Sequence, residues 1–331
     1  MNVTVIGLGL VGGSVLRALA AAGHHVVGHD ADPAPRATAR AAAAQAPPRQ
    51  RWEVAGTVRD AVAGADLVVV AVPLPAVAGV LAEVLDAGHT GLITDVTSVK
   101  EPVRALVDRQ AGAGGRRVRF VGGHPMAGRE TSGFGAADPD LFTGCAWVLC
   151  LEDGLTSLPD WLEMAALVTD LRARVVPATA AEHDRAVAAA SHVPHLLAAA
   201  LAAAVADDPL AGTLAAGSFR DGTRVAATRP ELVAAMCGGN APAVGPALDA
   251  LLVALGQARA ALDAPEPIEA LRVWLAPGSA ARRAWPPRAG TPVTLPARAD
   301  ALLDLGRAGG WVTGVAPDRR TVTAVRPVPP G

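Results

Sequence analysis

Short apolar runs separated by segments of helical period fill the first 150 residues. Apolar runs at 3–6 and 25–28 flank a helical stretch that begins near Ser14 and ends at Gly23. Further apolar runs occur at 65–77, 91–100, 118–128 and 144–150. The near-continuous valines at 65–77 are typical of a strand that is covered on both faces. Strands that alternate with helices in this way predict an α/β fold with a Rossmann-type, doubly wound parallel sheet.

The pattern changes after Pro177, where the chain becomes rich in alanine and keeps a helical period. It predicts an all-α domain that continues to about Ala264, in which Asp184, Ser191 and His195 share one helical stripe. A stretch rich in Pro, Gly and Arg then has the composition of a linker, and the remaining residues predict a strand, a helix and two strands. We therefore expect a Rossmann domain at 1–152, a helical domain at 153–265, and a linker with a short α+β appendage at 266–331.

The amino-acid composition argues against nucleic acid and membranes as binding partners. The 331 residues carry a net charge of −2, which provides no basic surface for nucleic acid or for a membrane. Residues 186–206 contain no Asp, Glu, Lys or Arg and are long enough to span a bilayer. Two histidines and Pro194 interrupt them, which favours a buried helix of a soluble protein. The three cysteines show no metal-ligand spacing and are odd in number, so we expect no metal site and a reducing cytoplasm.

A glycine-rich loop follows the first strand, with the sequence Gly7-Leu8-Gly9-Leu10-Val11-Gly12. Gly7 allows a tight turn, Gly9 lets a pyrophosphate approach the backbone, and Gly12 lets the helix and the strand pack closely. The helix that follows offers free N–H groups and a partial positive charge to phosphates. The sequence therefore predicts a dinucleotide site formed by these six residues.

An acidic residue, Asp30, ends the second strand of the same unit. A carboxylate at this position accepts hydrogen bonds from the ribose hydroxyls and repels a 2′-phosphate, which favours NAD over NADP. Arg36 lies six residues later and keeps NADP as the weaker alternative.

Several polar or loop residues come at the ends of the predicted strands. Val72 and Pro73 follow one strand, Ser98 follows the next, and His124 follows the run that begins at 118. In a doubly wound sheet, ligands bind beyond the carboxyl ends of the strands. We expect Val72, Pro73 and Ser98 to contact the cofactor, and His124 to lie where the nicotinamide meets its substrate.

Taken together, these motifs resemble the prephenate dehydrogenases of tyrosine biosynthesis, including their arogenate-using relatives, over residues 1–265. Lys100, the sole lysine of the chain, falls inside one of the matching motifs. The matching motifs are Gly7-Leu8-Gly9-Leu10-Val11-Gly12-Gly13-Ser14, Asp95-Val96-Thr97-Ser98-Val99-Lys100, Gly123-His124-Pro125-Met126-Ala127-Gly128-Arg129-Glu130, His183-Asp184, Ser191-His192-Val193-Pro194-His195 and Gly217-Ser218-Phe219-Arg220-Asp221-Gly222-Thr223-Arg224.

The resemblance implies NAD-dependent oxidative decarboxylation of prephenate to 4-hydroxyphenylpyruvate by a homodimer that assembles through the helical domain. It implies that His124 accepts the proton of the ring hydroxyl while Ser98 orients that hydroxyl. The substrate-binding roles that it implies fall on Arg224 for a carboxylate, His195 for the side-chain end, Glu130 as a gate, Asp221 as a partner of Arg224 or part of an ionic gate, and Gly217.

Three alternatives stay open. An arogenate dehydrogenase would form tyrosine directly, and Val233 stands where relatives often carry a tryptophan that shapes side-chain selectivity. A non-catalytic NAD-binding regulator is opposed by the intact set of His124, Ser98 and Arg224. The tail after residue 266 is short for the ligand-sensing ACT domain of some relatives, although a degenerate version of that domain would fit.

Overall fold

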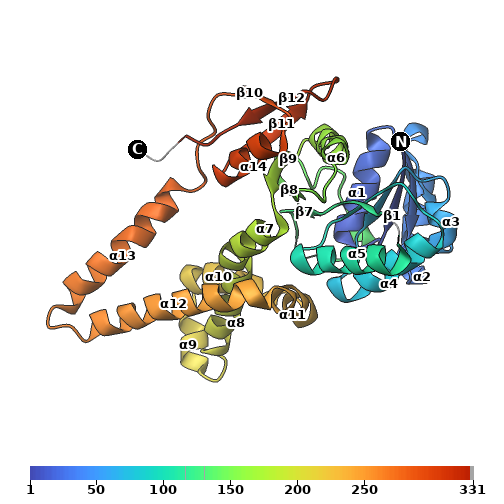
Figure 1. Ribbon diagram of the computed structural model, residues 1–331. Coiled ribbons are helices and arrows are strands. Elements are labelled where there is room, and N and C mark those ends of the chain that lie inside the picture. The colour runs from blue at the N-terminus through green and yellow to red at the C-terminus, as the bar shows by residue number, and fades with distance from the viewer. Residues whose placement is uncertain (116, 130, 329–331) are drawn as a thin grey trace.

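The computed structural model describes residues 1–115, 117–129 and 131–328. Figure 1 shows a parallel-sheet domain that contains the N-terminus, a second sheet beside it, and a group of helices from which α12 and α13 extend as a long hairpin. The C-terminal strands lie beside the green strands of the middle of the chain, so distant parts of the sequence meet in the second sheet.

The first sheet has six parallel strands in the order β3-β2-β1-β4-β5-β6. The order reverses direction beside β1, as in a doubly wound fold, so the Rossmann prediction is confirmed. All four residues of β4 are buried, which agrees with a strand covered on both faces. The elements are β1 (Asn2–Ile6), α1 (Leu10–Ala21), β2 (His25–His29), α2 (Pro33–Gln45), η1 (Pro48–Gln50), β3 (Glu53–Val54), α3 (Val58–Val62), β4 (Leu67–Val70), α4 (Leu74–Asp86), β5 (Leu92–Asp95), α5 (Glu101–Gly114) and β6 (Arg119–Val121).

The second sheet has the order β10-β12-β11-β9-β8-β7 and is mixed. Strands β8 and β9 are parallel, whereas β7 pairs with β8, and β11 pairs with β9, in the antiparallel sense. The elements of this part are β7 (Gly123–Pro125), η2 (Phe134–Ala136), β8 (Ala146–Cys150), α6 (Leu158–Asp170), β9 (Arg174–Ala178), β10 (Val293–Pro296), α14 (Ala299–Arg307), β11 (Trp311–Val315) and β12 (Thr321–Val325).

This second sheet corrects two expectations. The runs at 118–128 and 144–150 do not both extend the first sheet, because only β6 joins it and the chain leaves it at Gly122. A Cβ atom on Gly123 would meet the Asp95 carbonyl oxygen at 2.7 Å, so a glycine is needed where β7 crosses the end of β5. The segment predicted as all-α also contains β9. The domain limits at 152 and 265 stay a prediction.

The C-terminal segment forms the predicted short α+β appendage, in the order strand, helix, strand and strand, and its strands join the second sheet beside β9. Val312 of β11 pairs with Val175 of β9, and α14 packs on β9. The linker prediction for the residues before β10 is wrong, because α13 (Pro267–Ala284) is an 18-residue helix. Pro267 is tolerated because it is the first residue of this helix, and most of the residues that follow it favour a helix. Their preference outweighs the destabilising effect of the single interior proline, Pro277.

The helical part begins with a capped helix. The side chain of Thr179 accepts from the Glu182 N–H at 3.2 Å, and the Glu182 carboxylate accepts from the Thr179 N–H at 2.9 Å. The elements are α7 (Ala180–Val187), the π turn η3 (Ala188–His192), α8 (Val193–Ala203), α9 (Pro209–Leu214), α10 (Gly217–Thr223), η4 (Arg224–Ala227), α11 (Pro230–Gly239) and α12 (Ala241–Leu262).

The π turn changes which side chains face inward. Pro194 has no N–H to donate to the carbonyl oxygen four residues earlier. The π turn before it has one residue more per turn than an α-helix, which shifts the side chains that follow around the helix axis. His192 is therefore fully buried, whereas Ser191 is only half-buried. The expected stripe of Asp184, Ser191 and His195 assumed an uninterrupted α-helical period and is wrong at Ser191.

Two helical stretches, Ala180–Ala203 and Ala241–Leu262, have the length and apolar composition of helices that cross a membrane. In a single copy of the chain they are only partly covered. The first stretch buries Ala180, His183, Asp184, Val187, Ala188, His192, Val193 and Ala198, and the second buries Val244. The helix expected at 186–206 is thus only partly buried in one chain. Large exposed apolar faces of this kind mark surfaces that another molecule or a lipid phase covers.

Gly306 tests whether the C-terminal segment is an integral part of the fold. A Cβ atom at this position of α14 would meet the Pro177 carbonyl oxygen at 1.8 Å. Gly306→Ala should therefore lower the free energy of unfolding, measured by denaturant titration, by about 2–4 kcal/mol.

The matched control is Gly278→Ala in α13, where a Cβ atom would meet nothing within 4 Å. A better helix former there should leave stability unchanged or raise it by up to about 1 kcal/mol. Equal stability of the two variants would contradict the packing of α14 on β9.

Candidate active site

The loop between β1 and α1 has the geometry of a phosphate-binding turn. Gly7 has a φ of +101°, and a Cβ atom on it would meet the Ala71 carbonyl oxygen at 2.3 Å. A Cβ atom on Gly12 would meet the Gly7 carbonyl oxygen at 1.9 Å, whereas one on Gly9 would meet nothing within 4 Å. The outer two glycines thus allow close packing, and the middle one leaves its backbone open. No side chain caps the N-terminus of α1, within the described residues, so its N–H groups are available to an anion.

Asp30 lies against this loop. Its carboxylate accepts from the Leu8 N–H at 2.7 Å and from the Asp32 N–H at 2.9 Å. Each oxygen keeps a lone pair for a ribose hydroxyl. The guanidinium of Arg36 is turned inward and donates to the carbonyl oxygens of Asp30 at 2.7 Å and Ala31 at 3.3 Å. The one arginine that kept NADP as an alternative is therefore engaged with the backbone.

The other predicted cofactor residues lie next to the glycine loop. Val72 follows β4, and its Cγ1 atom would lie 3.0 Å from a Cβ atom on Gly7. Pro73 is the N-cap of α4. The loop that follows His124 reaches α1 from the other side, because Phe134 and Ala137 pack on Gly13 and the Asp138 N–H donates to Ser14 Oγ at 3.0 Å.

His124 is the end of a hydrogen-bonded row of three side chains. Its Nδ1 atom lies 2.8 Å from Nε2 of His183, and Nδ1 of His183 lies 2.7 Å from Oδ1 of Asp184. The Asp184 carboxylate also accepts from the backbone N–H groups of Lys100 at 2.8 Å and Glu101 at 2.9 Å, at the start of α5. Three separate elements, β7, α7 and α5, thus hold one row.

The carboxylate at the far end of the row decides the tautomers of both rings. Asp184 accepts, so Nδ1 of His183 carries the proton and its Nε2 is an acceptor. Nδ1 of His124 must then donate to His183, and the lone pair of His124 lies on Nε2. His124 is therefore a neutral imidazole with its basic nitrogen directed away from the row.

Burial and nearby charge agree with this assignment. Burial, followed by the charges of His183, Lys100 and His192, lowers the pKa of His124 well below 6.5. Burial also lowers the pKa of His183, against the opposing hydrogen bond to Asp184. Burial alone would raise the pKa of Asp184, but the hydrogen bonds from His183, Glu101 and Lys100 outweigh it and lower that pKa. At neutral pH the row holds one carboxylate and two neutral rings.

The sole lysine of the chain joins the first sheet to the strand of His124. Lys100 is 2% exposed, and its ammonium pairs with Asp95 and donates to Thr97 Oγ1 at 3.1 Å and to the Gly123 carbonyl oxygen at 2.6 Å. The second Asp95 oxygen accepts from the Gly123 N–H at 3.1 Å. Ser98 lies half-buried within this loop, so the network holds its backbone beside the start of β7. Within the described residues, the Ser98 side chain makes no hydrogen bond.

A buried amide ties the helices of the site together. Asn240, 3% exposed, donates to the Asp184 carbonyl oxygen at 2.8 Å and lies 3.1 Å from Nδ1 of His192. Burial and the charges of neighbours that include His183 and His195 lower the pKa of His192 to about 4. Among the buried histidine nitrogens of the described residues, His192 Nε2 and His195 Nδ1 have no partner. A buried polar atom without a partner is costly, so both suit a ligand with oxygen atoms.

The predicted substrate-binding residues lie in the helical part. Burial, followed by the positive charge of Arg224, lowers the pKa of His195, against a hydrogen bond with the Val225 backbone. These two predicted residues are therefore neighbours, and Gly217 begins the adjoining helix α10. Asp221 pairs at 3.7 Å with Arg220, its neighbour in the chain, and both side chains are exposed. Glu130 lies outside the described residues.

Sequence analysis missed three residues of the site. His183 and Asp184 were matched as a motif, but neither received a role, and Asn240 received none. The rarity of asparagine was a usable indication, since Asn240 is one of only two in the chain and the other, Asn2, is exposed. The row itself could not be found from spacing, because 59 residues separate His124 from His183.

In the part of the chain that the structure describes, no cluster of His, Cys, Asp or Glu is arranged to hold a metal ion.

The fold and the site define a two-domain dinucleotide-dependent dehydrogenase. A glycine loop lies on a doubly wound sheet, and a row of side chains that ends in a neutral imidazole joins this sheet to a helical domain. Comparison with known proteins specifies the family. Residues 15–177 match the model described as the prephenate dehydrogenase nucleotide-binding domain, and residues 179–276 match the prephenate dehydrogenase dimerization domain. The chain belongs to the prephenate dehydrogenase family.

Individual relatives agree with this family assignment. A prephenate dehydrogenase of Lactococcus lactis is 37% identical over 49% of this chain and 45% of its own length, so the chain spans less than half of that relative. A cyclohexadienyl dehydrogenase of Zymomonas mobilis is 32% identical over 79% of this chain and 88% of its own. A solved structure from Corynebacterium glutamicum, provisionally described as a prephenate dehydrogenase, is 35% identical with a TM-score of 0.77 and covers 86% of this chain and 90% of its own.

The buried pair of Lys100 and Asp95 leads to a stability prediction. Lys100→Met would leave Asp95 as a buried charge without a partner, so the free energy of unfolding should fall by about 3–5 kcal/mol in denaturant titrations. Asp95→Asn added to this variant removes the second charge and should restore part of the loss.

The exposed pair of Arg272 and Glu269 provides the control, and Arg272→Met should leave the free energy of unfolding nearly unchanged. Similar losses for Lys100→Met and Arg272→Met would show that the buried network does not hold β7 in place.

Proposed function

We propose that this chain is an NAD-dependent dehydrogenase that converts prephenate to 4-hydroxyphenylpyruvate and CO2, with His124 as the proton acceptor. The observation that carries the proposal is the row of Asp184, His183 and His124, which leaves a lone pair on Nε2 of a neutral ring. The family to which the chain belongs provides the reaction class.

The residues of the glycine loop fit the dinucleotide. The open backbone at Gly9, the uncapped N-terminus of α1 and the Asp30 carboxylate match its pyrophosphate and its ribose hydroxyls. The engaged guanidinium of Arg36 favours NAD, because a 2′-phosphate would meet Asp30 without a free cation from Arg36. When bound, the nicotinamide ring supplies the hydride acceptor.

The residues of this chain have one proton to move. The ring hydroxyl of prephenate loses its proton as the carbon that bears it loses hydride, and Nε2 of His124 accepts that proton. The positive charge that develops on His124 is then shared through His183 with the Asp184 carboxylate. Loss of CO2 makes the ring aromatic and drives the reaction, so the protein mainly orients the substrate.

Two groups in the helical part suit the anionic ends of the substrate. The planar guanidinium of Arg224 can pair with both oxygens of a carboxylate, and its neighbour His195 has a buried Nδ1 that no described residue satisfies. We assign the ring hydroxyl to Ser98 as well as to His124, and the gate at the pocket to Glu130. Gly217 leaves room beside Arg220 at the start of α10.

Arogenate is the second candidate substrate. It differs from prephenate by an amino group in place of the keto oxygen, and both share the cyclohexadienol ring on which the chemistry takes place. The Zymomonas mobilis relative, 88% of which is covered, is named for that ring and not for either side chain. Values of kcat/KM for prephenate and arogenate, each with NAD and with NADP, distinguish the four combinations.

Steady-state kinetics distinguish the role of the proton acceptor, which affects kcat, from that of the carboxylate-binding residue, which affects KM. His124→Asn should lower kcat for prephenate by about 10²–10⁴-fold, whereas Arg224→Ala should mainly raise KM, by about 10–100-fold. The wild-type rate should persist below pH 6.5 and fall as the pH drops through the lowered pKa of His124, since the protonated ring has no lone pair.

His25→Asn, which changes an exposed imidazole, is the control and should keep both constants. If His124→Asn retains its turnover while still binding NAD, His124 is not the proton acceptor.

We also propose that the functional unit is a homodimer in which a second copy covers the exposed faces of α12 and α13. Seven large apolar side chains of these helices are more than 40% exposed, and the family model that matches this region is a dimerization domain. A second copy would remove this apolar surface from water without a lipid phase. The exposed side chains are Leu252, Val253, Leu255, Leu262, Ile268, Val273 and Leu275.

A charge within this face should prevent assembly. Leu252→Glu, at a position 56% exposed in the single chain, should convert the dimer to a monomer in light-scattering measurements at micromolar concentration. Val293→Glu changes an exposed side chain on β10 and should leave the mass unchanged. A wild-type monomer, or a dimer that survives Leu252→Glu, would contradict this interface.

A further inference from the structure

His192 is a buried histidine that belongs neither to the row that ends in His124 nor to the carboxylate site. Its side chain is fully buried, and its Nε2 atom has no partner within the described residues. It lies in the π turn between α7, which carries His183, and α8, which carries His195. Because a buried polar atom without a partner is destabilising, Nε2 indicates the position of a ligand atom.

A neighbouring amide decides which nitrogen of His192 carries the proton. Nδ2 of Asn240 lies 3.1 Å from Nδ1 of His192 and 2.8 Å from the Asp184 carbonyl oxygen. An amide oxygen in that position would meet the carbonyl oxygen with no proton between them, so the NH2 group of Asn240 donates to both neighbours. Nδ1 of His192 therefore accepts, and Nε2 carries the proton. Burial, the largest cause, lowers the pKa of His192 to about 4, so at neutral pH the ring is an uncharged donor.

The π turn places His192 on the same side of the helix as Asp184. The chain from Asp184 to His192 makes about two full turns, because the π turn is wider than an α-helical turn. A single nitrogen atom of Asn240 contacts both residues, which requires them to lie one above the other. The ring of His192 thus follows the row along one face of the helix.

The Nε2 atom of His192 faces the region between the two ends of the site. The charges of His183 and His195 act on His192, and the charge of His192 acts on His124, so the four rings are near one another. Asn240 occupies the Nδ1 side of the ring, which leaves Nε2 on the side of these histidines. Along the helix, His192 lies after His183 and one turn before His195.

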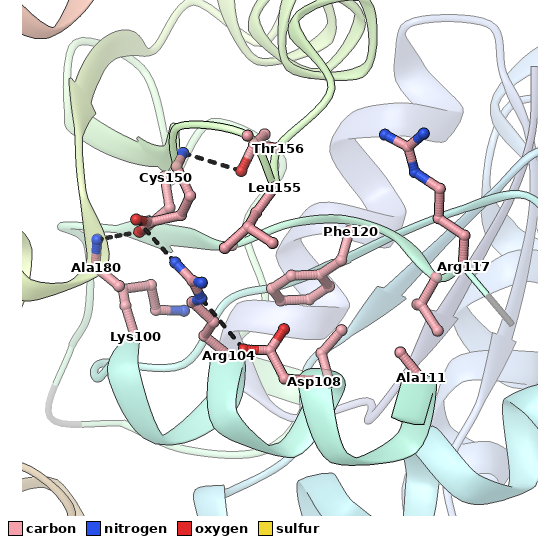
Figure 2. A pocket seen from close by; sticks show the side chains of 15 residues that line it. Lys100, Arg104, Asp108, Ala111, Arg117, Phe120, Cys150, Leu155, Thr156 and Ala180 are labelled. Carbon is pink, nitrogen blue, oxygen red and sulfur yellow. Dashed lines mark hydrogen bonds and ion pairs between the residues drawn. The ribbon is translucent and has the colours of Figure 1, made fainter. Parts of the chain in front are cut away.

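The helix that carries His192 is fixed at its start. The Glu152 carboxylate accepts from the Ala180 N–H at 2.5 Å and pairs with Arg104 of α5 at 2.9 Å (Figure 2). The bond from Asn240 to the backbone of Asp184 fixes the same helix further along. The fold therefore sets the direction of the donor before any ligand arrives.

We propose that Nε2–H of His192 donates to the keto oxygen of prephenate and so makes the enzyme prefer prephenate to arogenate, an inference that rests on the proposed function. His124 receives the ring hydroxyl and His195 the far end of the side chain. The group between the ring and that end reaches His192.

The two substrates differ only in that group. A keto oxygen accepts a hydrogen bond from a fixed N–H, whereas the ammonium group of arogenate has donors alone and would meet the N–H with no acceptor between them. The ring cannot adapt by moving its proton to Nδ1, because Nδ1 would then lose its bond with Asn240. Asn240 is therefore a positioning residue that acts through His192.

Substrate preference tests the proposal. The wild type should show a kcat/KM for prephenate at least about tenfold above that for arogenate, both with NAD. His192→Phe should lower the value for prephenate by about 10–100-fold and the value for arogenate by less than about threefold. Both substrates contain the ring hydroxyl and the ring carboxylate, so damage to the row, or loss of a contact with that carboxylate, changes both values alike and cancels from their ratio.

His89→Phe is the matched control, because it replaces a buried imidazole that precedes β5 and lies outside the site. It should keep the wild-type ratio. A wild type that prefers arogenate, or a ratio that His192→Phe leaves unchanged, would overturn the proposal.

The role of Asn240 is read from the tautomer as well as from kinetics. NMR of the histidine ring nitrogens at neutral pH should show the proton of His192 on Nε2 in the wild type. Asn240→Ala should populate both tautomers and reduce the preference for prephenate. A wild-type proton on Nδ1, or an unchanged tautomer and preference in Asn240→Ala, would contradict the assignment.

Binding without turnover separates this inference from the proposed function. Calorimetry on the full-length protein with NAD compares 4-hydroxyphenylpyruvate with free tyrosine, which differ in the same keto and amino groups. The keto acid should bind the wild type at least about tenfold more tightly, and His192→Phe should bind the two about equally. Failure of both prephenate and arogenate to turn over would reject the proposed function, whereas equal or tighter binding of tyrosine by the wild type, or no binding of the keto acid, would reject the role of His192.

Discussion

The buried ion pair between Lys100 and Asp95 is the constraint on which the rest of the site depends. It places a charged pair at the junction of the two sheets, and the remaining bonds of both side chains go to the backbone of Gly123 and to Thr97. Buried charges of this kind are tolerated only when every donor and acceptor is satisfied. The pair therefore positions β7, and with it His124, relative to the loop that contains Ser98. An arginine would be a poor substitute, because a compact ammonium reaches three acceptors in different directions.

A second set of bonds carries this order into the helical part. Asp184 binds the start of α5 through two N–H groups, Asn240 binds the carbonyl of Asp184, and His183 connects the carboxylate to His124. The imidazole of His124 is thus held from the Rossmann sheet on one side and from α7 on the other.

The fold was largely predictable, with failures at identifiable residues. The glycine loop and the buried valines of β4 specify their elements locally, so the parallel sheet followed from them. The second sheet did not, because its pairing of β9 with β11 joins residues 137 positions apart, at Val175 and Val312. The stripe on α7 and α8 failed at the π turn before Pro194, where a proline changes the helical period. The linker prediction failed over α13 because the Pro, Gly and Arg content of that stretch hides a run of good helix formers that begins with a tolerated proline.

The sequence by itself determined the dinucleotide loop, the acid at Asp30, the family and the candidate imidazole at His124. Each of these depends on residues that are close in the chain, where local geometry requires a particular residue type. Only the tertiary structure decided that His183 and Asp184 stand behind His124, and that Arg36 is turned toward the backbone. A hydrogen bond requires its donor and acceptor atoms to lie about 3 Å apart. Whether residues on different helices and strands meet this requirement depends on how those elements pack, which no periodicity along the chain encodes.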